Sequence, residues 1–185
     1  MLEALQNLDG GILLWIQNAL RCGILDSFFS CYTRLGDAGL MWIILSALML
    51  FHPKTRKAGF LGLAAMLLGL VCTNLILKPL IHRTRPWLVV EGLTFLVKER
   101  DPHSFPSGHT CSAFAAACAW WFCLPKRRMG VTGLVLAALM GFSRLYVGVH
   151  FPTDVLAGAM VGSLCGWAVW MAYQRLGPRL PRILQ

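Results

Sequence analysis

Charged residues are scarce in this chain, and that scarcity determines its class. Only 14% of the 185 residues are charged, whereas 57% are hydrophobic. The mean hydropathy is +0.62, which excludes an ordinary soluble domain of this length. The sequence therefore predicts an integral membrane protein.

Other absences narrow the function. The seven cysteines form no C-x-x-C pair, which leaves a thiol or disulfide site without support. Five of them lie in apolar stretches, and we interpret these as small core residues: Cys72, Cys111, Cys118, Cys123 and Cys165. No G-x-x-x-x-G-K-[ST] run is present, so nucleotide-driven transport has no support. Residues 1–9 hold no Lys or Arg, and we expect no cleavable signal peptide. The net charge of +9 arises largely from basic residues in short connections, which indicates control of membrane topology and not nucleic-acid binding.

Long apolar stretches dominate what is present. Five of them are nearly free of charge and long enough to cross or nearly cross a bilayer: 37–53, 58–77, 107–124, 129–149 and 155–174. We therefore expect an all-α fold, a polytopic transmembrane helical bundle of about five to six spans. One domain covers residues 1–185, with residues 37–174 as its catalytic bundle, and we find no internal repeat or linker.

The segment 10–34 is helical in pattern but is not a clean span. Arg21 and Asp26 interrupt it near its middle, where a charge costs roughly 2.5–3.5 kcal/mol on an insertion scale. On a helical wheel the apolar residues share one arc: Ile12, Leu13, Trp15, Ile16, Ala19 and Leu20. We expect an amphipathic helix that lies at the membrane interface or is partly inserted.

The basic residues assign the connections to sides of the membrane. Three segments carry Lys and Arg without any acid: Lys54, Arg56 and Lys57; Lys126, Arg127 and Arg128; Arg175, Arg179 and Arg182. Cytoplasmic connections are enriched in Lys and Arg. We therefore expect these segments and the C-terminus to be cytoplasmic, and the long connection 78–106 and the corner near residue 150 to be extracytoplasmic.

Ionisable and small polar residues collect on that extracytoplasmic side, in three clusters: Lys78 with Arg83 and Arg85; Pro106-Ser107-Gly108-His109; and Ser143-Arg144 with His150 and Asp154. Each cluster alone has a structural explanation. The cations could extend to lipid headgroups, Pro and Ser could start a helix, and a single His could be a structural donor. Their convergence on one side instead indicates a functional site.

The chemistry of this set points to phosphate. Guanidinium and ammonium groups with helix N–H donors match phosphoryl oxygens. His150 can act as a nucleophile if a partner such as Asp154 holds its other ring nitrogen, and His109 can then protonate the leaving oxygen and activate water. Two His and one Asp could also bind zinc or iron, but the cations Lys78, Arg85 and Arg144 would repel a dication. We expect no metal and no cofactor.

The chain resembles the type 2 phosphatidic acid phosphatases, membrane relatives of the vanadium haloperoxidases, in three motifs. The motifs are Lys, six residues and Arg-Pro (Lys78 to Arg85-Pro86); Pro-Ser-Gly-His (Pro106 to His109); and Ser-Arg, five residues, His, three residues and Asp (Ser143-Arg144, His150, Asp154). The resemblance implies His150 as nucleophile, Asp154 as its orienting acid and His109 as acid/base. It also implies a phosphate-binding set: Lys78, Arg85, Ser107, Gly108 and Arg144.

The function expected from this resemblance is a metal-independent, integral membrane lipid phosphatase that forms a phosphohistidine intermediate. Undecaprenyl diphosphate and phosphatidylglycerol phosphate are the leading substrates, and phosphatidic acid is a third. Two alternatives stay open at this point. The same site could transfer phosphate to another lipid head, or it could bind or transport lipid phosphates without chemistry.

Overall fold

The computed structural model describes residues 2–176, and all regular elements in this part of the chain are helical. Arg179 and Arg182, which the sequence predicts to be cytoplasmic, lie outside the described residues. In chain order the elements are α1 (Leu2–Leu20), α2 (Gly23–Leu35), the 3₁₀ turn η1 (Asp37–Gly39), α3 (Leu40–Leu50), α4 (Arg56–Leu70), the π-helix η2 (Val71–Leu77), α5 (Lys78–Ile81), α6 (Pro86–Val89), α7 (Gly108–Cys123), α8 (Arg127–Tyr146) and α9 (Pro152–Leu176).

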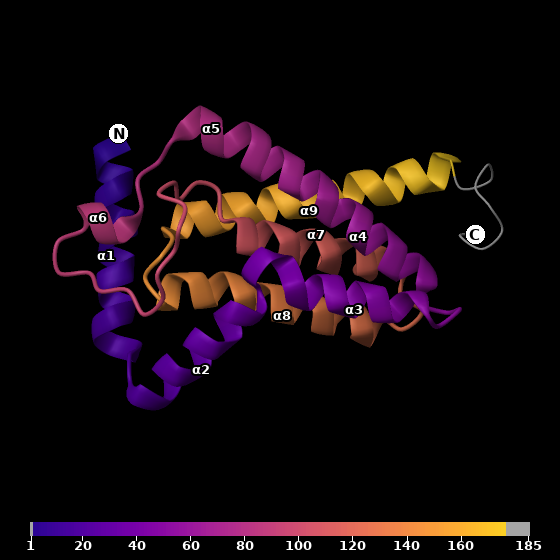
Figure 1. Cartoon of the computed structure of the whole chain (residues 1–185), viewed down its shortest axis with the longest axis horizontal. Coiled ribbons are helices and arrows are strands. Elements are labelled where there is room, and N and C mark those ends of the chain that lie inside the picture. The colour runs from indigo at the N-terminus through magenta and orange to yellow at the C-terminus, as the bar shows by residue number, and fades with distance from the viewer. Residues whose placement is uncertain (1, 177–185) are drawn as a thin grey trace.

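Helices α3, α4, α7, α8 and α9 run side by side in an elongated bundle (Figure 1). Helix α7 is its centre and packs against α4, α8 and α9. Its buried positions are mostly small, with Ala113, Ala115, Ala116, Ala117 and Ala119 fully enclosed. Large apolar side chains such as Leu67, Val135 and Leu164 are exposed on the outside. This distribution suits a bundle surrounded by lipid, where an apolar exterior has no cost.

The predicted helical membrane fold is confirmed. By length and composition, three helical segments in the described part can cross a membrane: Arg56–Ile81, Arg127–Tyr146 and Pro152–Leu176. The pair Gly23–Leu35 and Asp37–Leu50, bent by 51°, counts as a fourth if it forms one broken span. Helix α7 has 16 residues and lies among these spans, in the position predicted for the span 107–124.

A row of glycines brings α9 against α7. Gly158, Gly162 and Gly166 follow each other at intervals of four and therefore share one face of α9. A Cβ on Gly162 would lie 2.3 Å from the carbonyl oxygen of Cys111 on α7. Small residues at such intervals allow helix backbones in membranes to approach closely. The same face begins with Asp154, whose carbonyl accepts a hydrogen bond from the Ser107 amide at 3.0 Å.

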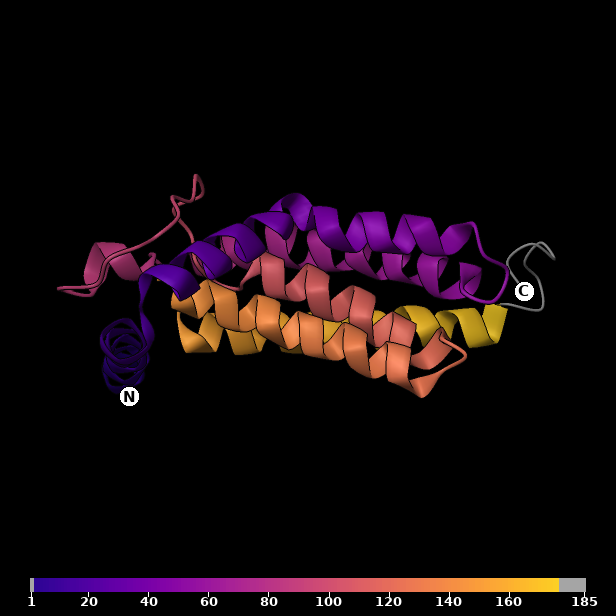
Figure 2. The same cartoon turned by 90° about the horizontal axis from the view of Figure 1, so that it is seen from below.

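The N-terminal segment differs from the single helix expected over residues 10–34. It consists of two helices, α1 and α2, that separate at Arg21 and Cys22. Helix α1 lies across one end of the bundle and is seen end-on in Figure 2. Helix α2 instead leads into the bundle and meets α3 at a bend, where Ala38 and Gly39 have positive φ.

Polar partners explain why Arg21 and Asp26 are tolerated in this segment. The Arg21 guanidinium donates to the carbonyls of Thr94 (2.7 Å) and Tyr146 (3.1 Å). The Asp26 carboxylate accepts from the Tyr146 hydroxyl at 2.7 Å. Both charges therefore lie at the bundle end and stabilise the junction between α1, α2 and α8, instead of being buried in a span.

Candidate active site

The three predicted clusters meet at one end of the bundle. Lys78 begins α5, Ser107 caps α7, and His150 lies between α8 and α9, all at the end that α1 crosses in Figure 1. The basic connections between α3 and α4 and between α7 and α8 lie at the opposite end. The site clusters and the basic connections therefore lie at opposite ends of the bundle, as the charge pattern predicted.

His150 is held with its two ring nitrogens in different surroundings. Its side chain is 2% exposed, and Nε2 lies 3.0 Å from Nη1 of Arg85. A guanidinium can only donate, so Nε2 is an acceptor and the neutral ring carries its proton on Nδ1. Nδ1 lies 3.6 Å from Oδ2 of Asp154, which is longer than a hydrogen bond. Burial, then the charges of Arg85 and Arg144, lower the pKa of His150 well below its ordinary value.

Asp154 is itself positioned by a network that the motifs do not include. Its Oδ1 accepts from Arg83 at 2.7 Å, and its Oδ2 accepts from the Phe151 amide at 2.9 Å. The same Arg83 guanidinium binds Asp9 of α1 at 2.7 Å, and Asp9 also contacts Thr153. Helix α1 is thereby joined to Asp154, the residue that faces His150.

His109 projects from the first turn of α7 and has an acidic partner of its own. Its Nε2 lies 3.0 Å from Oδ1 of Asp37, which stands at the bend between α2 and α3. Gly36 permits this approach, because a Cβ there would lie 2.9 Å from Cδ2 of His109. The bend therefore brings an orienting carboxylate to the predicted acid/base.

Three cations surround the site, and we refer to Lys78, Arg85 and Arg144 as the cradle cations. Arg85 and Arg144 are almost completely buried. Arg144 donates to Thr33 at 2.5 Å and forms an ion pair with Glu99. Arg85 lies 4.0 Å from the other Glu99 oxygen, and Lys78 lies 2.5 Å from Asp101. Each cradle cation therefore faces a carboxylate of the connection 90–106.

Ser107 and Gly108 occupy different roles in the structure. The Ser107 hydroxyl is buried and accepts from the amide and the hydroxyl of Thr110, at 3.4 and 2.9 Å, so it caps α7. Gly108 lines the cavity beside His109, and a Cβ on it would have only the Asn74 side chain nearby, at 3.7 Å. Of these two predicted phosphate ligands, Gly108 is the one that borders open space.

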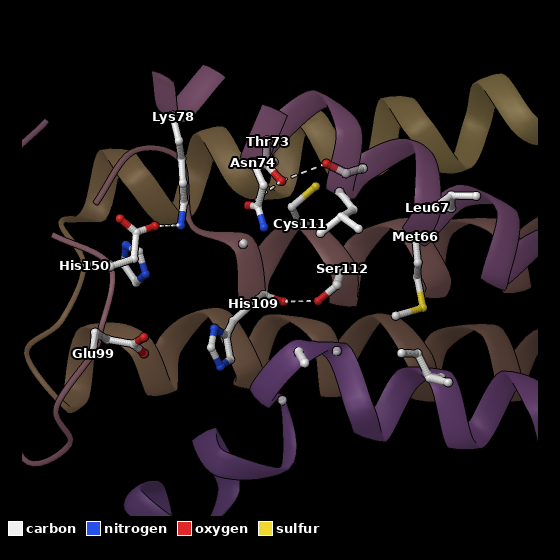
Figure 3. A pocket seen from close by; sticks show the side chains of 18 of the residues that line it. Met66, Leu67, Thr73, Asn74, Lys78, Glu99, His109, Cys111, Ser112 and His150 are labelled. Carbon is white, nitrogen blue, oxygen red and sulfur yellow. Dashed lines mark hydrogen bonds and ion pairs between the residues drawn. The ribbon is translucent and has the colours of Figure 1, made fainter. Parts of the chain in front are cut away.

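A cavity of about 570 Å³ joins the charged site to the apolar bundle. Lys78, Glu99, His109 and His150 border one part of it, and Met66 and Leu67 border another (Figure 3). A second cavity of about 610 Å³ adjoins Arg144, Glu99 and His109. Among the side chains that the structure describes, residues 6–176, no group of three or more His, Cys, Asp or Glu is arranged to hold a metal.

Sequence reasoning missed several residues that the structure places at the site. Glu99 and Asp101 contact the cradle cations, Asp37 contacts His109, and Asp9 reaches Arg83. The one signal for Glu99 and Asp101 was their place in the predicted extracytoplasmic connection 78–106, in a chain with only eight acidic residues. Asp9 and Asp37 had no such signal.

Comparison with known proteins gives the family. The PAP2 superfamily model matches residues 59–178. An undecaprenyl-diphosphatase of Sulfolobus acidocaldarius is 32% identical over 72% of this chain, and the match spans 63% of that protein. A lipid A 4'-phosphatase of Bacteroides thetaiotaomicron is 28% identical over 97% of this chain and 83% of its own length.

A solved structure agrees with these matches. The crystal structure of a transmembrane PAP2 type phosphatidylglycerolphosphate phosphatase from Bacillus subtilis has a TM-score of 0.75 and 31% identity. The similarity covers 97% of this chain and 89% of that one. The chain belongs to the PAP2 superfamily, which confirms the resemblance seen in the three motifs and, with it, the class of protein: an integral membrane lipid phosphatase.

Proposed function

We propose that this protein hydrolyses the terminal phosphate of a membrane lipid in two displacements at phosphorus, with His150 as the nucleophile of the first. The observation that carries this proposal is the orientation of the His150 ring, with Nε2 toward Arg85 and Nδ1 toward Asp154. Nε2 is therefore unprotonated and accepts from Arg85, the cation that would hold the phosphoryl group. The low pKa of His150, caused by burial and the neighbouring arginines, keeps Nε2 unprotonated at neutral pH.

In the first displacement, Nε2 of His150 attacks phosphorus and the bond from phosphorus to the leaving oxygen breaks. His109 supplies a proton to that oxygen, and Asp154 stabilises the charge that develops on the ring. In the second displacement, His109 takes a proton from water, whose oxygen attacks phosphorus. The phosphorus–nitrogen bond then breaks, which releases inorganic phosphate and restores His150. The cradle cations, with Gly108 and the start of α7, bind the phosphoryl oxygens.

The apolar part of the cavity supports a lipid as substrate. Ile43 of α3 and Leu67 and Leu70 of α4 line it and are also exposed on the bundle surface. A tail could therefore enter sideways while its head reaches the cradle cations. The relatives named above act on an isoprenoid diphosphate, lipid A and phosphatidylglycerolphosphate. We propose undecaprenyl diphosphate or phosphatidylglycerol phosphate as substrate, with the site extracytoplasmic.

The test is phosphate release by the detergent-solubilised chain with EDTA present, for undecaprenyl diphosphate, phosphatidylglycerol phosphate, phosphatidic acid and a soluble phosphate ester. We expect release from lipid phosphates under EDTA and at least a ~10³-fold loss of turnover in His150→Ala, since the nucleophile acts with its partners as a unit. A phosphorylated acceptor lipid in place of free phosphate would indicate phosphotransfer. Turnover by His150→Ala close to that of the wild type would refute the mechanism.

A further inference from the structure

The connection between α6 and α7 places two acidic side chains beside the cradle cations. Residues 98–101 read Lys-Glu-Arg-Asp, and exposure alternates along them: Lys98 and Arg100 are exposed, whereas Glu99 and Asp101 are partly buried. All four residues border the second cavity, but it is the two acids that form ion pairs with the cradle cations.

The two acids contact the groups that the proposed reaction assigns to phosphate. Glu99 bridges Arg144 and Arg85, one carboxylate oxygen toward each, and Asp101 binds Lys78 at 2.5 Å. Arg85 also donates from Nε to the Asp101 carbonyl at 2.9 Å. These contacts occupy donors of the three cations that would bind phosphoryl oxygens, so a carboxylate and a phosphate would compete for them.

The charges of this arrangement are stable at neutral pH. Burial alone would raise the pKa of Glu99, but the charges of Arg144, His109 and Arg85 and the hydrogen bond from Arg144 outweigh it and lower that pKa. Burial alone would also raise the pKa of Asp101, but the hydrogen bonds from Lys78 and from the His103 amide outweigh it, so that this pKa is lowered as well. Two fixed negative charges therefore face three fixed positive ones.

We propose that Glu99 and Asp101 form an intramolecular counter-anion that exchanges with the phosphoryl group on the cradle cations during each reaction cycle. An entering substrate displaces the two carboxylates, and their return displaces inorganic phosphate at the end. This proposal rests on the proposed function, because it takes Lys78, Arg85 and Arg144 as the phosphate ligands.

The physical reason for such an exchange is product release. Two buried arginines and a lysine around a phosphate dianion would hold it tightly, since charge-assisted hydrogen bonds are stronger than neutral ones. A buried cation left without any partner would also be costly. A tethered carboxylate removes both difficulties, because its effective concentration is high and it occupies the cations as the phosphate leaves.

The test measures inorganic phosphate binding to the full-length chain in detergent by isothermal titration calorimetry, without any turnover. The variants are Glu99→Gln and Asp101→Asn, which keep the side-chain shape and remove the charge. Glu91→Gln is the matched control, because Glu91 belongs to the same connection but is exposed and lines neither cavity. The experiment uses a mildly alkaline buffer, in which inorganic phosphate is a dianion.

We expect each of the two variants to bind phosphate about tenfold more tightly than the wild type, since an ionic hydrogen bond no longer competes, and Glu91→Gln to be unchanged. The KM for lipid substrate and the inhibition constant of phosphate should fall together. Unchanged, weaker or undetectable phosphate binding in folded Glu99→Gln and Asp101→Asn would overturn the inference. If Glu99→Gln does not fold, Asp101→Asn decides alone.

The two proposals fail in different ways. Tighter phosphate binding by the variants, together with no hydrolysis of any lipid phosphate by the wild type, would remove the proposed function and support the counter-anion. Hydrolysis by the wild type, together with identical phosphate affinity in all variants, would support the proposed function and remove the counter-anion.

Discussion

Arg85 has two effects on His150. It donates to Nε2, which fixes the tautomer, and its charge adds to burial in lowering the pKa of that histidine. A phosphate bound to Arg85 would engage the guanidinium and leave Nε2 facing phosphorus. In the proposed reaction, Arg85 therefore orients His150 in the free protein, and substrate binding then frees Nε2 from Arg85.

The suppressed pKa of His150 has a measurable effect on stability. Below the ordinary histidine pKa of about 6.5, the unfolded chain binds a proton at this residue that the folded site refuses, so folding stability falls as the pH falls. The loss reaches about 1.4 kcal/mol per pH unit. We expect the melting temperature of the wild type to fall more steeply between about pH 7 and pH 5 than that of His150→Asn.

The comparison with His150→Asn isolates this one group, because the other four histidines are common to both proteins. Both proteins are melted in the same detergent and buffers. If the melting temperatures of the two proteins changed equally with pH, His150 would titrate normally in the folded protein.

At the scale of elements, the contact between α9 and α7 determines where Asp154 lies relative to the start of α7. Replacing Gly162 by Ala places a Cβ 2.3 Å from the Cys111 carbonyl oxygen, and backbone cannot move aside cheaply. We expect Gly162→Ala to destabilise the fold by about 3 kcal/mol and to lower activity, as measured by thermal melting and phosphate release.

Gly11 provides the matched control on α1. A Cβ there meets no atom within 4 Å, so Gly11→Ala should leave the melting temperature unchanged or raise it slightly through helix propensity, by up to about 1 kcal/mol. Equal melting temperatures for the two alanine variants would contradict the close contact between α9 and α7.

Helix α1 should contribute to catalysis through Asp9 and Arg83. Removing the Asp9 charge frees Arg83 from one of its two carboxylates and loosens its hold on Asp154. We expect Asp9→Asn and Arg83→Gln each to lower kcat by about tenfold with little change in KM, since a charged hydrogen bond is worth roughly 1.5–3 kcal/mol. Steady-state phosphate release measures both constants.

The double variant tests whether the two side chains act through one contact. Neighbours in one network are not additive, so the combined loss should be close to that of Arg83→Gln alone. Losses that multiply, with the pair contributing independently, would show that α1 does not act through Arg83.

At the scale of the whole molecule, the positions of the charges predict an orientation in the membrane. In a background in which the exposed Cys22 and Cys31 are replaced by Ser, a membrane-impermeant thiol reagent added to intact cells should label Glu91→Cys and not Lys126→Cys. The reason is the excess of Lys and Arg at the end that contains Lys126. The reverse labelling pattern would place the site in the cytoplasm.

The sequence predicted the helical bundle and the grouping of His150, Asp154, His109 and Lys78, because hydrophobicity and short motifs are local signals. It did not predict that Glu99 would face Arg144 or that Asp9 would reach Arg83, because these pairs join residues 45 and 74 positions apart. The break at Cys22 was also missed, since both helices beside it carry apolar faces that continue one periodic pattern.

The cavity that reaches the bundle surface between α3 and α4 changes what substrate concentration means for this protein. A lipid that enters there arrives by diffusion within the bilayer plane, so the rate of encounter depends on its mole fraction among neighbouring lipids and not on its amount per volume of solution. Extra detergent or inert lipid should therefore slow the reaction at constant total substrate. In a membrane rich in other lipids, these lipids dilute the substrate within the bilayer and so lower the rate of the enzyme.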